Sequence, residues 1–268
     1  MDFARKLARA WDASGTSLCV GLDPIVERMP AEFAASPRPV LSFNRHIIEL
    51  VGARVCAFKP QAAHHGALAA ERDLADTIAY IRERHPHALI ILDAKRGDIG
   101  STAAMYAREA FDRYDADAVT VNPFMGDDAV LPFLTRPDRA AVILCRTTNP
   151  DAGRYQNALV DGVPMYLAIA RRAEKTWNAL NNAMLVVGAT QPEDLAKVRR
   201  AAPSLPFLVP GIGEQGGSVR AVVDAGRRVD GWGLVVSASR SILYAGGPDQ
   251  IRQAVETARG ELDLASVD

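Results

Sequence analysis

The densest set of groups that could do chemistry lies in the segment 92–102, LDAKRGDIGST. It carries two carboxylates, Asp93 and Asp98, and one ammonium, Lys95, directly after an apolar run that is typical of a buried strand. Because alternate residues of a strand point to the same side, we expect Asp93 and Lys95 to lie together if the strand continues that far. Opposite charges at this spacing would keep one another ionised, which favours a catalytic site. A structural cluster of ion pairs that caps the strand and the next helix is the alternative.

A second lysine ends a different apolar run. Lys59 precedes Pro60, so its backbone is expected to be extended. By itself it would be interpreted as a rim lysine whose ammonium reaches water. Beside the acid and base groups of segment 92–102, it becomes an equal candidate for the active site.

The third chemical feature is a glycine-rich segment, 210–217 (PGIGEQGG), which follows another apolar run. Glycines such as Gly213 let backbone N–H groups approach an anion, and the start of the following helix adds its dipole. Ser239 and Arg240 follow the last apolar run, and arginine offers a forked cation to phosphate. These features predict a phosphate site; an ordinary turn and a surface arginine are the alternative.

The elements that must position these groups repeat along the chain as short apolar runs followed by stretches with helical patterns. The runs are rich in Val, Ile, Leu and Ala without alternation, as in parallel strands that are buried on both faces. They occupy residues 18–22, 55–58, 88–92, 118–121, 140–145, 183–187, 206–209 and 233–236. The expected helices are 41–51, 74–84, 101–114, 164–180, 192–202, 217–225 and 248–258.

Eight such units in 268 residues predict an α/β fold, a (β/α)₈ TIM barrel in which residues 1–268 form one domain. A doubly wound sheet uses the same units, but no G-x-G-x-x-G follows the first strand. We expect a short N-terminal helix over residues 1–11 that closes the bottom of the barrel, and an acidic tail that frays after Gly260. The longest irregular stretch, 149–162, is expected to be a lid or binding loop.

Composition excludes several classes of function. Lys and Arg total 31 and Asp and Glu total 32, so no overall field would attract nucleic acid or an anionic membrane. No apolar run is long enough to span a bilayer, and the charged N-terminus does not resemble a signal peptide. We therefore expect a cytoplasmic protein that binds neither nucleic acid nor membranes.

Cysteine and histidine do not indicate a disulfide framework or a metal site. Cys19, Cys56 and Cys145 are odd in number, widely spaced and set in apolar runs, as expected for buried reduced thiols. His64 and His65 are adjacent, but no third ligand has suitable spacing. We predict no metal ion and no cofactor.

Segment 92–102 resembles the D-x-K-x-x-D signature of the orotidine 5′-phosphate decarboxylase family, in the form found in its longer mycobacterial and other bacterial members. Further matching motifs follow in the family's order: GLD at 21–23, FKP at 58–60, TTNP at 147–150, PGIGEQGG at 210–217 and SRS at 239–241. The resemblance covers nearly the whole chain. The D-x-K-x-x-D motif alone is shared with relatives in the same superfamily, whereas the ordered set is specific.

The resemblance implies roles for individual residues. Lys59, Asp93, Lys95 and Asp98 match the family's alternating array of lysines and aspartates. Asp98, with Ile99 and Thr102, matches residues that reach into the neighbouring subunit's site, which implies a homodimer with shared active sites. The remaining substrate-binding residues that it implies are Asp23 and Lys59 at the ribose, Thr148 at the amide edge of the pyrimidine, and Gly213, Gln215, Ser239 and Arg240 towards the phosphate.

One of these positions departs from the family pattern. Thr148 stands where serine is frequent; it keeps the hydroxyl and adds a methyl group, so Thr147 could share the contact with the pyrimidine.

The implied reaction is decarboxylation of orotidine 5′-phosphate to UMP and CO₂, the last step of de novo UMP synthesis, without a cofactor. Loss of CO₂ from C6 leaves a carbanion that no neighbouring group delocalises, so a cation must stabilise it. Lys95 is the candidate for this role and for protonating C6. The alternatives are a Mg²⁺-dependent sugar-phosphate decarboxylase or aldolase-like enzyme, against which Lys59 argues, and a non-catalytic nucleotide-binding barrel, against which the complete charged array argues.

Overall fold

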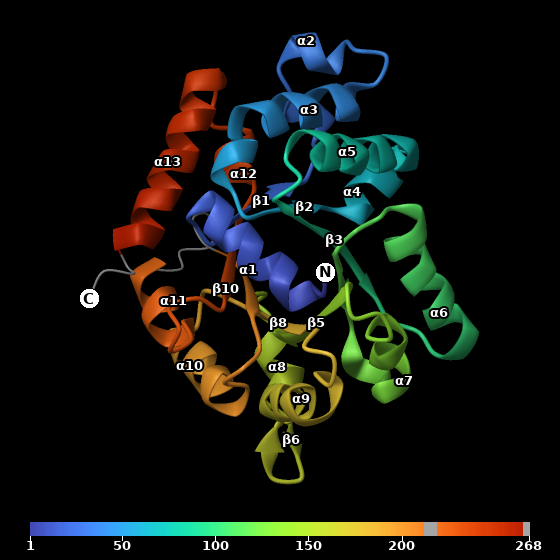
Figure 1. Cartoon of the computed structure of the whole chain (residues 1–268), viewed down its shortest axis with the longest axis vertical. Helices are drawn as coiled ribbons and strands as arrows, with labels where there is room; N and C mark the ends of the chain where they lie inside the picture. Colours follow the sequence, from blue (N-terminus) through green and yellow to red (C-terminus); the bar gives the residue numbers. More distant parts are fainter. Residues whose placement is uncertain (212–218, 265–268) are drawn as a thin grey trace.

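The computed structural model describes residues 1–211 and 219–264, without the side chains of 263 and 264. Within these residues, eight parallel strands close into a barrel in the order β1-β10-β9-β8-β5-β4-β3-β2 (Figure 1). This confirms the predicted TIM barrel. The strands are β1 Leu18–Leu22, β2 Ala57–Pro60, β3 Leu89–Arg96, β4 Ala118–Val121, β5 Ala140–Arg146, β8 Ala183–Val187, β9 Phe207–Pro210 and β10 Leu234–Ala238.

The helices surround the barrel and cover its outer face (Figure 1). The longer ones are α3 Pro39–Val51, α5 Glu71–Arg84, α6 Gly100–Arg108, α9 Met165–Arg172, α10 Pro192–Ala201, α11 Val219–Gly226 and α13 Pro248–Leu264. Helices α6 and α9 each end in a π-helical turn, η3 Glu109–Arg113 and η6 Ala173–Trp177. Single-turn segments connect the rest: α2 Ala31–Ala34, α4 Ala62–Ala67, α7 Asp127–Val130, α12 Arg240–Leu243, η1 Val26–Arg28, η2 Gly52–Arg54, η4 Pro123–Met125 and η5 Leu131–Phe133.

Burial of both strand faces explains why the apolar runs do not alternate. One set of side chains packs inside the barrel, including Leu89, Val142 and Leu208. The other set, such as Phe58 and Ile90, packs between the barrel and the helices. Because each strand residue meets apolar surface on either side, polar residues occur mainly at the strand ends, where the chain leaves the core.

The N-terminal helix α1 (Phe3–Ser14) lies across the N-terminal end of the barrel (Figure 1). Its apolar face carries Leu7 and Trp11, which are buried against the interior cluster of the barrel. The Trp11 indole donates a hydrogen bond of 3.0 Å to the Leu234 carbonyl and stacks on Trp232 at 5.3 Å between ring centroids. The helix therefore closes this end of the barrel.

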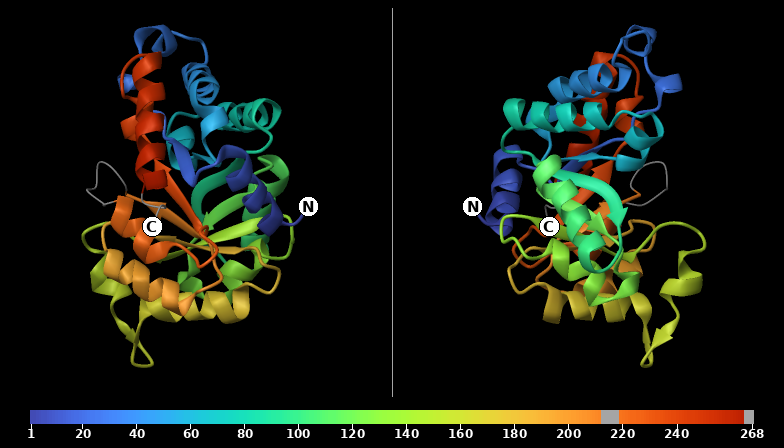
Figure 2. Two further views of the ribbon diagram at one scale, coloured as in Figure 1. Left: turned by 60° about the vertical axis from the view of Figure 1, so that its left-hand side comes forward. Right: turned by 90° about the vertical axis from the view of Figure 1, so that its right-hand side faces the viewer.

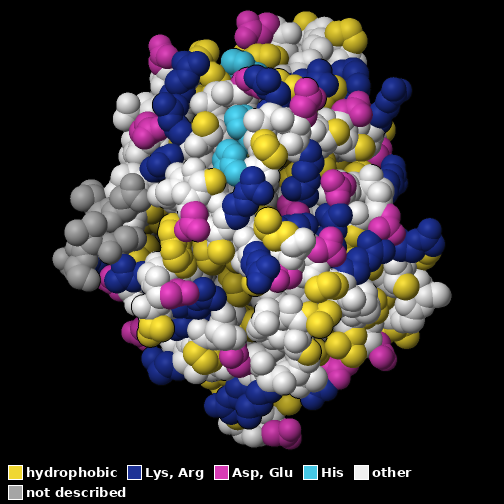
Figure 3. All heavy atoms as spheres, in the orientation of Figure 1, with side chains coloured by type: hydrophobic (Ala, Val, Ile, Leu, Met, Phe, Trp, Pro, Cys, Tyr) yellow, Lys and Arg dark blue, Asp and Glu magenta, His cyan; other side chains and the backbone are white. Residues whose placement is uncertain are grey.

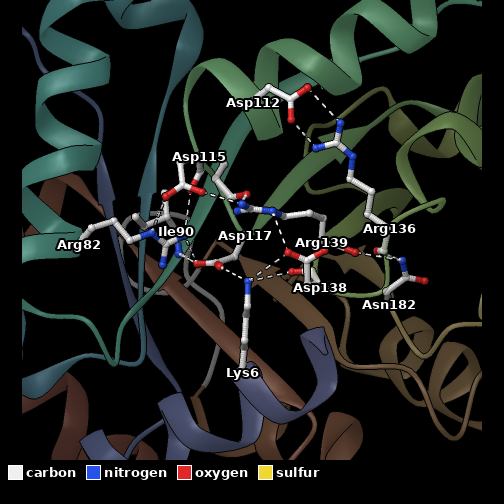
Figure 4. Close-up of polar contacts among 11 residues, drawn as sticks. Lys6, Arg82, Ile90, Asp112, Asp115, Asp117, Arg136, Asp138, Arg139 and Asn182 are labelled. Atoms are coloured by element: carbon white, nitrogen blue, oxygen red, sulfur yellow. Dashed lines mark hydrogen bonds and ion pairs between the residues drawn. The ribbon is translucent and has the colours of Figure 1, made fainter. Parts of the chain in front are cut away.

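An ion-pair cluster fastens α1 at this closed end (Figure 4). The Asp117 carboxylate, 1% exposed, accepts a hydrogen bond of 3.0 Å from the Ile90 backbone N–H. Its oxygens also lie 3.1 Å from Lys6 Nζ and 2.7 Å from Arg82 Nη2. The same face mixes acidic and basic side chains on its surface (Figure 3). This cluster joins α1 and α5 to the start of β4, far from the strand ends that carry the candidate site.

The structure corrects the frayed tail that was expected after Gly260, and it shows that the stretch 149–162 is partly regular. The role of that stretch as a lid or binding loop stays a prediction. Helix α13 continues past Gly260 to Leu264, because Leu262 is buried against the core, so residues 261–264 do not form a frayed tail. Residues 265–268 lie outside the described part. The stretch 149–162 contains the short helix α8 (Ala152–Gln156) and most of a hairpin, β6 Leu159–Val160 and β7 Val163–Pro164, which projects from the barrel (Figure 2).

We predict that Asp117→Asn lowers the free energy of unfolding by about 2 kcal/mol. The amide keeps an acceptor for Ile90 N–H but removes the buried charge that Lys6 and Arg82 share, which leaves them only the more exposed carboxylates of Asp138 at 4.0 Å and Asp115 at 3.4 Å. Equilibrium urea unfolding followed by circular dichroism measures this loss. Asp112→Asn is the matched control, because the Asp112–Arg136 pair in the same region is exposed and should leave the midpoint nearly unchanged (Figure 4). Equal midpoints for the two variants would contradict the structural role of Asp117.

Candidate active site

A cavity of about 530 Å³ opens at the C-terminal end of the barrel strands. Its walls come from the ends of strands and from the loops that follow them, where TIM-barrel enzymes build their active sites. Seven of the residues predicted from the sequence line it: Asp23, Lys59, Asp93, Lys95, Thr148, Ser239 and Arg240. Gly213 and Gln215 lie outside the described residues.

Asp93, at the end of β3, is the centre of the polar network. Its Oδ1 lies 2.7 Å from Lys95 Nζ and accepts the Thr120 hydroxyl at 2.9 Å. Its Oδ2 accepts from Lys59 Nζ and from Gln61 Nε2, each at 3.0 Å. Burial by itself would raise the pKa of this carboxyl, but the charges of Lys59 and Lys95 outweigh burial and hold the pKa well below its usual range. Asp93 is therefore a carboxylate whose two oxygens each have two donors.

Lys59 projects from β2 and is 5% exposed. Burial would lower the pKa of its ammonium, but the negative charges of Asp93 and Asp23 outweigh burial and raise the pKa. Asp23 Oδ1 is 3.9 Å from Lys59 Nζ, beyond hydrogen-bond distance. That buried oxygen has no hydrogen-bond partner among the described residues. A buried acceptor without a partner in a cavity wall can receive a hydroxyl group of a ligand.

Lys95 reaches the cavity through an irregularity in the strand. The register between β3 and β4 shifts between Leu92 and Arg96, and Lys95 has a left-handed backbone with φ of 46°. Thr120 stabilises this bend because its hydroxyl oxygen accepts the N–H groups of Ala94 at 3.0 Å and Lys95 at 2.9 Å. The side chains of Asp93 and Lys95 do meet, as predicted, but a bulge brings them together and the regular alternation of a strand does not.

The structure places Asp98, Ile99 and Thr102 away from this network. They follow β3 at the start of α6, and none of them lines the cavity. The Asp98 carboxylate accepts the N–H of Ile99 at 2.8 Å, and the Ile99 side chain is 51% exposed. Within one chain, the described network is therefore Lys59, Asp93 and Lys95, without the fourth charge that the sequence grouped with them.

The end of β5 forms another wall of the cavity. Thr147 donates its hydroxyl to Asn149 Oδ1 at 2.7 Å and accepts Gln156 Nε2 at 2.8 Å. Thr148 packs its methyl group over Gly188, where a Cβ would lie 2.3 Å from that methyl. The sequence left open which threonine faces a base; here the Thr147 hydroxyl is already used as both donor and acceptor.

A further wall comes from the ends of β9 and β10, with Gly211, Ser239 and Arg240. Gly211 has a φ of 98°, a conformation that favours glycine. A Cβ on Gly21 of β1 would lie 1.9 Å from the Ser239 hydroxyl oxygen, so only glycine lets β1 approach this residue. The predicted phosphate end thus lies on adjacent strands, although most of its glycine-rich segment is outside the described residues.

Among the polar cavity residues that sequence reasoning did not predict as site residues are Gln61, Thr120 and Gln156. Gln61 stands two residues after Lys59, so the alternation rule used for Asp93 and Lys95 also places it on the cavity side. Thr120 is the one polar residue in the apolar run of β4, and this position could have indicated a contact with the site. Gln156 comes from a loop helix, and nothing in its local sequence indicates where it lies.

The three cysteines and His65 occupy buried positions. All three cysteines are free and buried, and burial raises the pKa of Cys19 to about 12. His65 is fully buried and its Nδ1 lies 2.9 Å from the Gln61 carbonyl oxygen. In residues 1–211 and 219–264 no group of three or more His, Cys, Asp or Glu side chains is arranged to hold a metal ion. None of the described helices has the length and apolar character needed to cross a bilayer.

Comparisons with known proteins agree on one family. Residues 16–255 match the model of the Orotidine 5′-phosphate decarboxylase / HUMPS family. The chain is 51% identical to orotidine 5′-phosphate decarboxylase of Cellvibrio japonicus over 256 residues, which cover 95% of this chain and 94% of that relative. It is 49% identical over 254 residues to the protein of the same name from a Janthinobacterium species, with the same shares covered.

A solved structure gives the same result. The OMP decarboxylase of Leishmania donovani superimposes with a TM-score of 0.87 at 37% identity, and the match covers 99% of each chain. The family model matches most of the chain, and the two bacterial relatives match nearly all of it. The chain therefore belongs to the orotidine 5′-phosphate decarboxylase / HUMPS family.

Proposed function

We propose that this chain is a carboxy-lyase that converts orotidine 5′-phosphate to UMP and CO₂ in pyrimidine biosynthesis. The observation that carries the proposal is the network of Lys59, Asp93 and Lys95 in the cavity of a family member. A site that only binds a ligand does not need a buried carboxylate between two lysines. Because burying these charges costs folding free energy, their presence favours a catalytic role.

The cavity suggests how the nucleotide lies. Its phosphate is directed towards β9 and β10, where Arg240 supplies a cation, and the Gly213 and Gln215 segment belongs to the same end. Asp23 and Lys59 contact the ribose, with Asp23 Oδ1 as acceptor for a hydroxyl. The base then points across the barrel, with its C6 at Lys95 and its amide edge at Thr148. The distant phosphate supplies binding energy that holds the ring in position.

The reaction breaks the bond between C6 and the carboxylate carbon, and the electron pair stays on C6 as CO₂ leaves. The Lys95 ammonium, adjacent to C6, stabilises this charge because Asp93 holds it in place and the bound nucleotide displaces water from the cavity. Lys95 then transfers a proton from Nζ to C6, which gives UMP and a neutral amine that water reprotonates. Asp93 holds Lys95 in place and cannot turn away from the leaving carboxylate, because its oxygens are fixed by four donors.

The network also argues against the magnesium-dependent alternative. A divalent cation would need carboxylate oxygens as ligands. Both oxygens of Asp93 already accept two hydrogen bonds each, two of them from ammonium groups that would repel a metal ion. The proposed reaction accordingly uses neither metal nor cofactor.

We further propose that the enzyme is a homodimer in which Asp98, Ile99 and Thr102 complete the partner's site. Exposed apolar side chains in the segments that follow β3 and β4 support this arrangement. Ile99 and Met105 of the α6 region are 51% and 57% exposed, and Phe124 and Met125 after β4 are 82% and 54% exposed. Large apolar groups in such exposure are typical of surfaces that another protein covers. The three buried, free thiols fit a reducing cytosolic location.

The proposed activity predicts loss of orotate absorbance when the protein is mixed with orotidine 5′-phosphate in the presence of EDTA. Lys95→Ala should lower kcat by about 10³-fold or more, because both the cation and the proton donor are removed. Lys175→Ala, which removes an exposed lysine outside the cavity, is the control and should retain the wild-type rate. Turnover that requires added Mg²⁺, or a Lys95→Ala variant with near-normal rate, would reject the mechanism.

The shared site predicts complementation between two inactive variants. An equimolar mixture of Lys95→Ala and Asp98→Asn subunits, refolded together, should recover about a quarter of the wild-type activity, because half of the dimers are mixed and each has one intact site. Each variant alone measures the background. If both residues served the site of their own chain, the mixture would show no more activity than the average of the two variants.

A further inference from the structure

Gln156 is a polar residue of the cavity wall for which the reaction above has no role. It ends the short helix α8, which the chain forms after β5, and its amide is fixed by three contacts. Oε1 accepts the Thr147 backbone N–H at 3.0 Å and Arg146 Nη1 at 3.2 Å. Nε2 donates to the Thr147 hydroxyl at 2.8 Å. Gln156 therefore grips both the backbone and the side chain of Thr147.

The orientation of this amide is determined by Arg146. That residue ends β5, is 4% exposed and donates from Nε to Asp194 Oδ2 at 2.9 Å. Its Nη2 donates to Gln191 Oε1, and its Nη1 is left for Gln156. Since Arg146 can only donate, the oxygen of the Gln156 amide must face it, and the amide nitrogen faces Thr147 and the cavity. A rigid buried cation thus sets which end of the amide a ligand meets.

The hydrogen bonds of Thr147 also position the residues next to it. The Thr147 hydroxyl donates its proton to Asn149 Oδ1 at 2.7 Å, so Gln156 and Asn149 join the two ends of the α8 loop. Thr148, between them, packs over Gly188 and lines the cavity. With Gln156 in place, the backbone and hydroxyl of Thr148 keep a defined position at this wall.

We propose that Gln156 determines specificity for the base. It holds the Thr147–Thr148 segment against the ring, and it presents its second Nε2 hydrogen to an acceptor oxygen on the pyrimidine edge. Thr147 uses one of the two Nε2 hydrogens, and no other described residue accepts from this amide. The ligand class is a base with a carbonyl oxygen at that edge. The inference rests on the proposed function, since that function directs the base towards β5.

The test separates the base from the sugar phosphate. Inhibition constants of UMP and of ribose 5-phosphate against orotidine 5′-phosphate turnover are measured for the wild type and Gln156→Ala. We expect UMP binding to weaken about tenfold, from the loss of hydrogen bonds at the base, while ribose 5-phosphate binding changes less than about twofold. KM for the substrate should rise in parallel with the UMP constant.

Two further variants sharpen the result. Gln191→Ala removes the other amide held by Arg146 but lies outside the cavity, so the ratio of the two inhibition constants should remain that of the wild type. Thr147→Val removes the hydroxyl that accepts from Gln156 and keeps the backbone contact. It should therefore raise the inhibition constant of UMP by about threefold. It also keeps the proposal testable if Gln156→Ala does not fold.

The outcomes are distinct. Equal weakening of UMP and ribose 5-phosphate, or no change in either, would overturn the role of Gln156. Wild-type protein without any turnover of orotidine 5′-phosphate would instead reject the proposed function, before any variant is compared.

Discussion

A buried carboxylate between two ammonium groups is the constraint on which the open end of this barrel depends. Asp93 stays ionised only because donors reach both of its oxygens, and those donors come from three neighbouring strands and the loop after one of them. Removing the carboxylate itself would leave the buried Lys59 ammonium without its nearest counter-ion, which is costly in a protein interior. Closure of the barrel, which sets β2 beside β3 and β3 beside β4, is therefore a precondition of the site.

The two ends of the barrel use the same interaction for different purposes. At the closed end, the Asp117 carboxylate binds Lys6 and Arg82 and fastens α1 and α5 to the strands. The acidic and basic groups there pair with one another, and the cavity that they line is smaller, about 310 Å³ against about 530 Å³ at the open end. At the open end, Lys95 keeps half of its side chain exposed to the cavity and can act on a ligand. Stability and chemistry are thus separated along the barrel axis.

Groups around the cavity divide into those that react and those that hold them. Thr120 contacts Asp93, Ala94 and Lys95 together. These hydrogen bonds stabilise the left-handed backbone of Lys95, which directs its side chain to the cavity. Gln156 and the buried Arg146 do the same for the β5 wall. Asp98 and Ile99 do not line the cavity, which leaves one chain with an incomplete charge array and makes a second subunit a part of the chemistry that we propose.

The sequence by itself determined the barrel and most of its cavity, because continuous apolar runs mark strands buried on both faces and the residues after them must meet at one rim. It also indicated Asp93, Lys95, Lys59 and Arg240 by type and position. Only the tertiary structure decided that an irregularity of β3 turns Lys95 to the cavity and that Gln156 reaches it, whereas the family resemblance already implied that Asp98 serves the neighbouring site. Each of these depends on contacts between residues far apart in the chain or on the local bend of a loop, which spacing along the sequence does not encode.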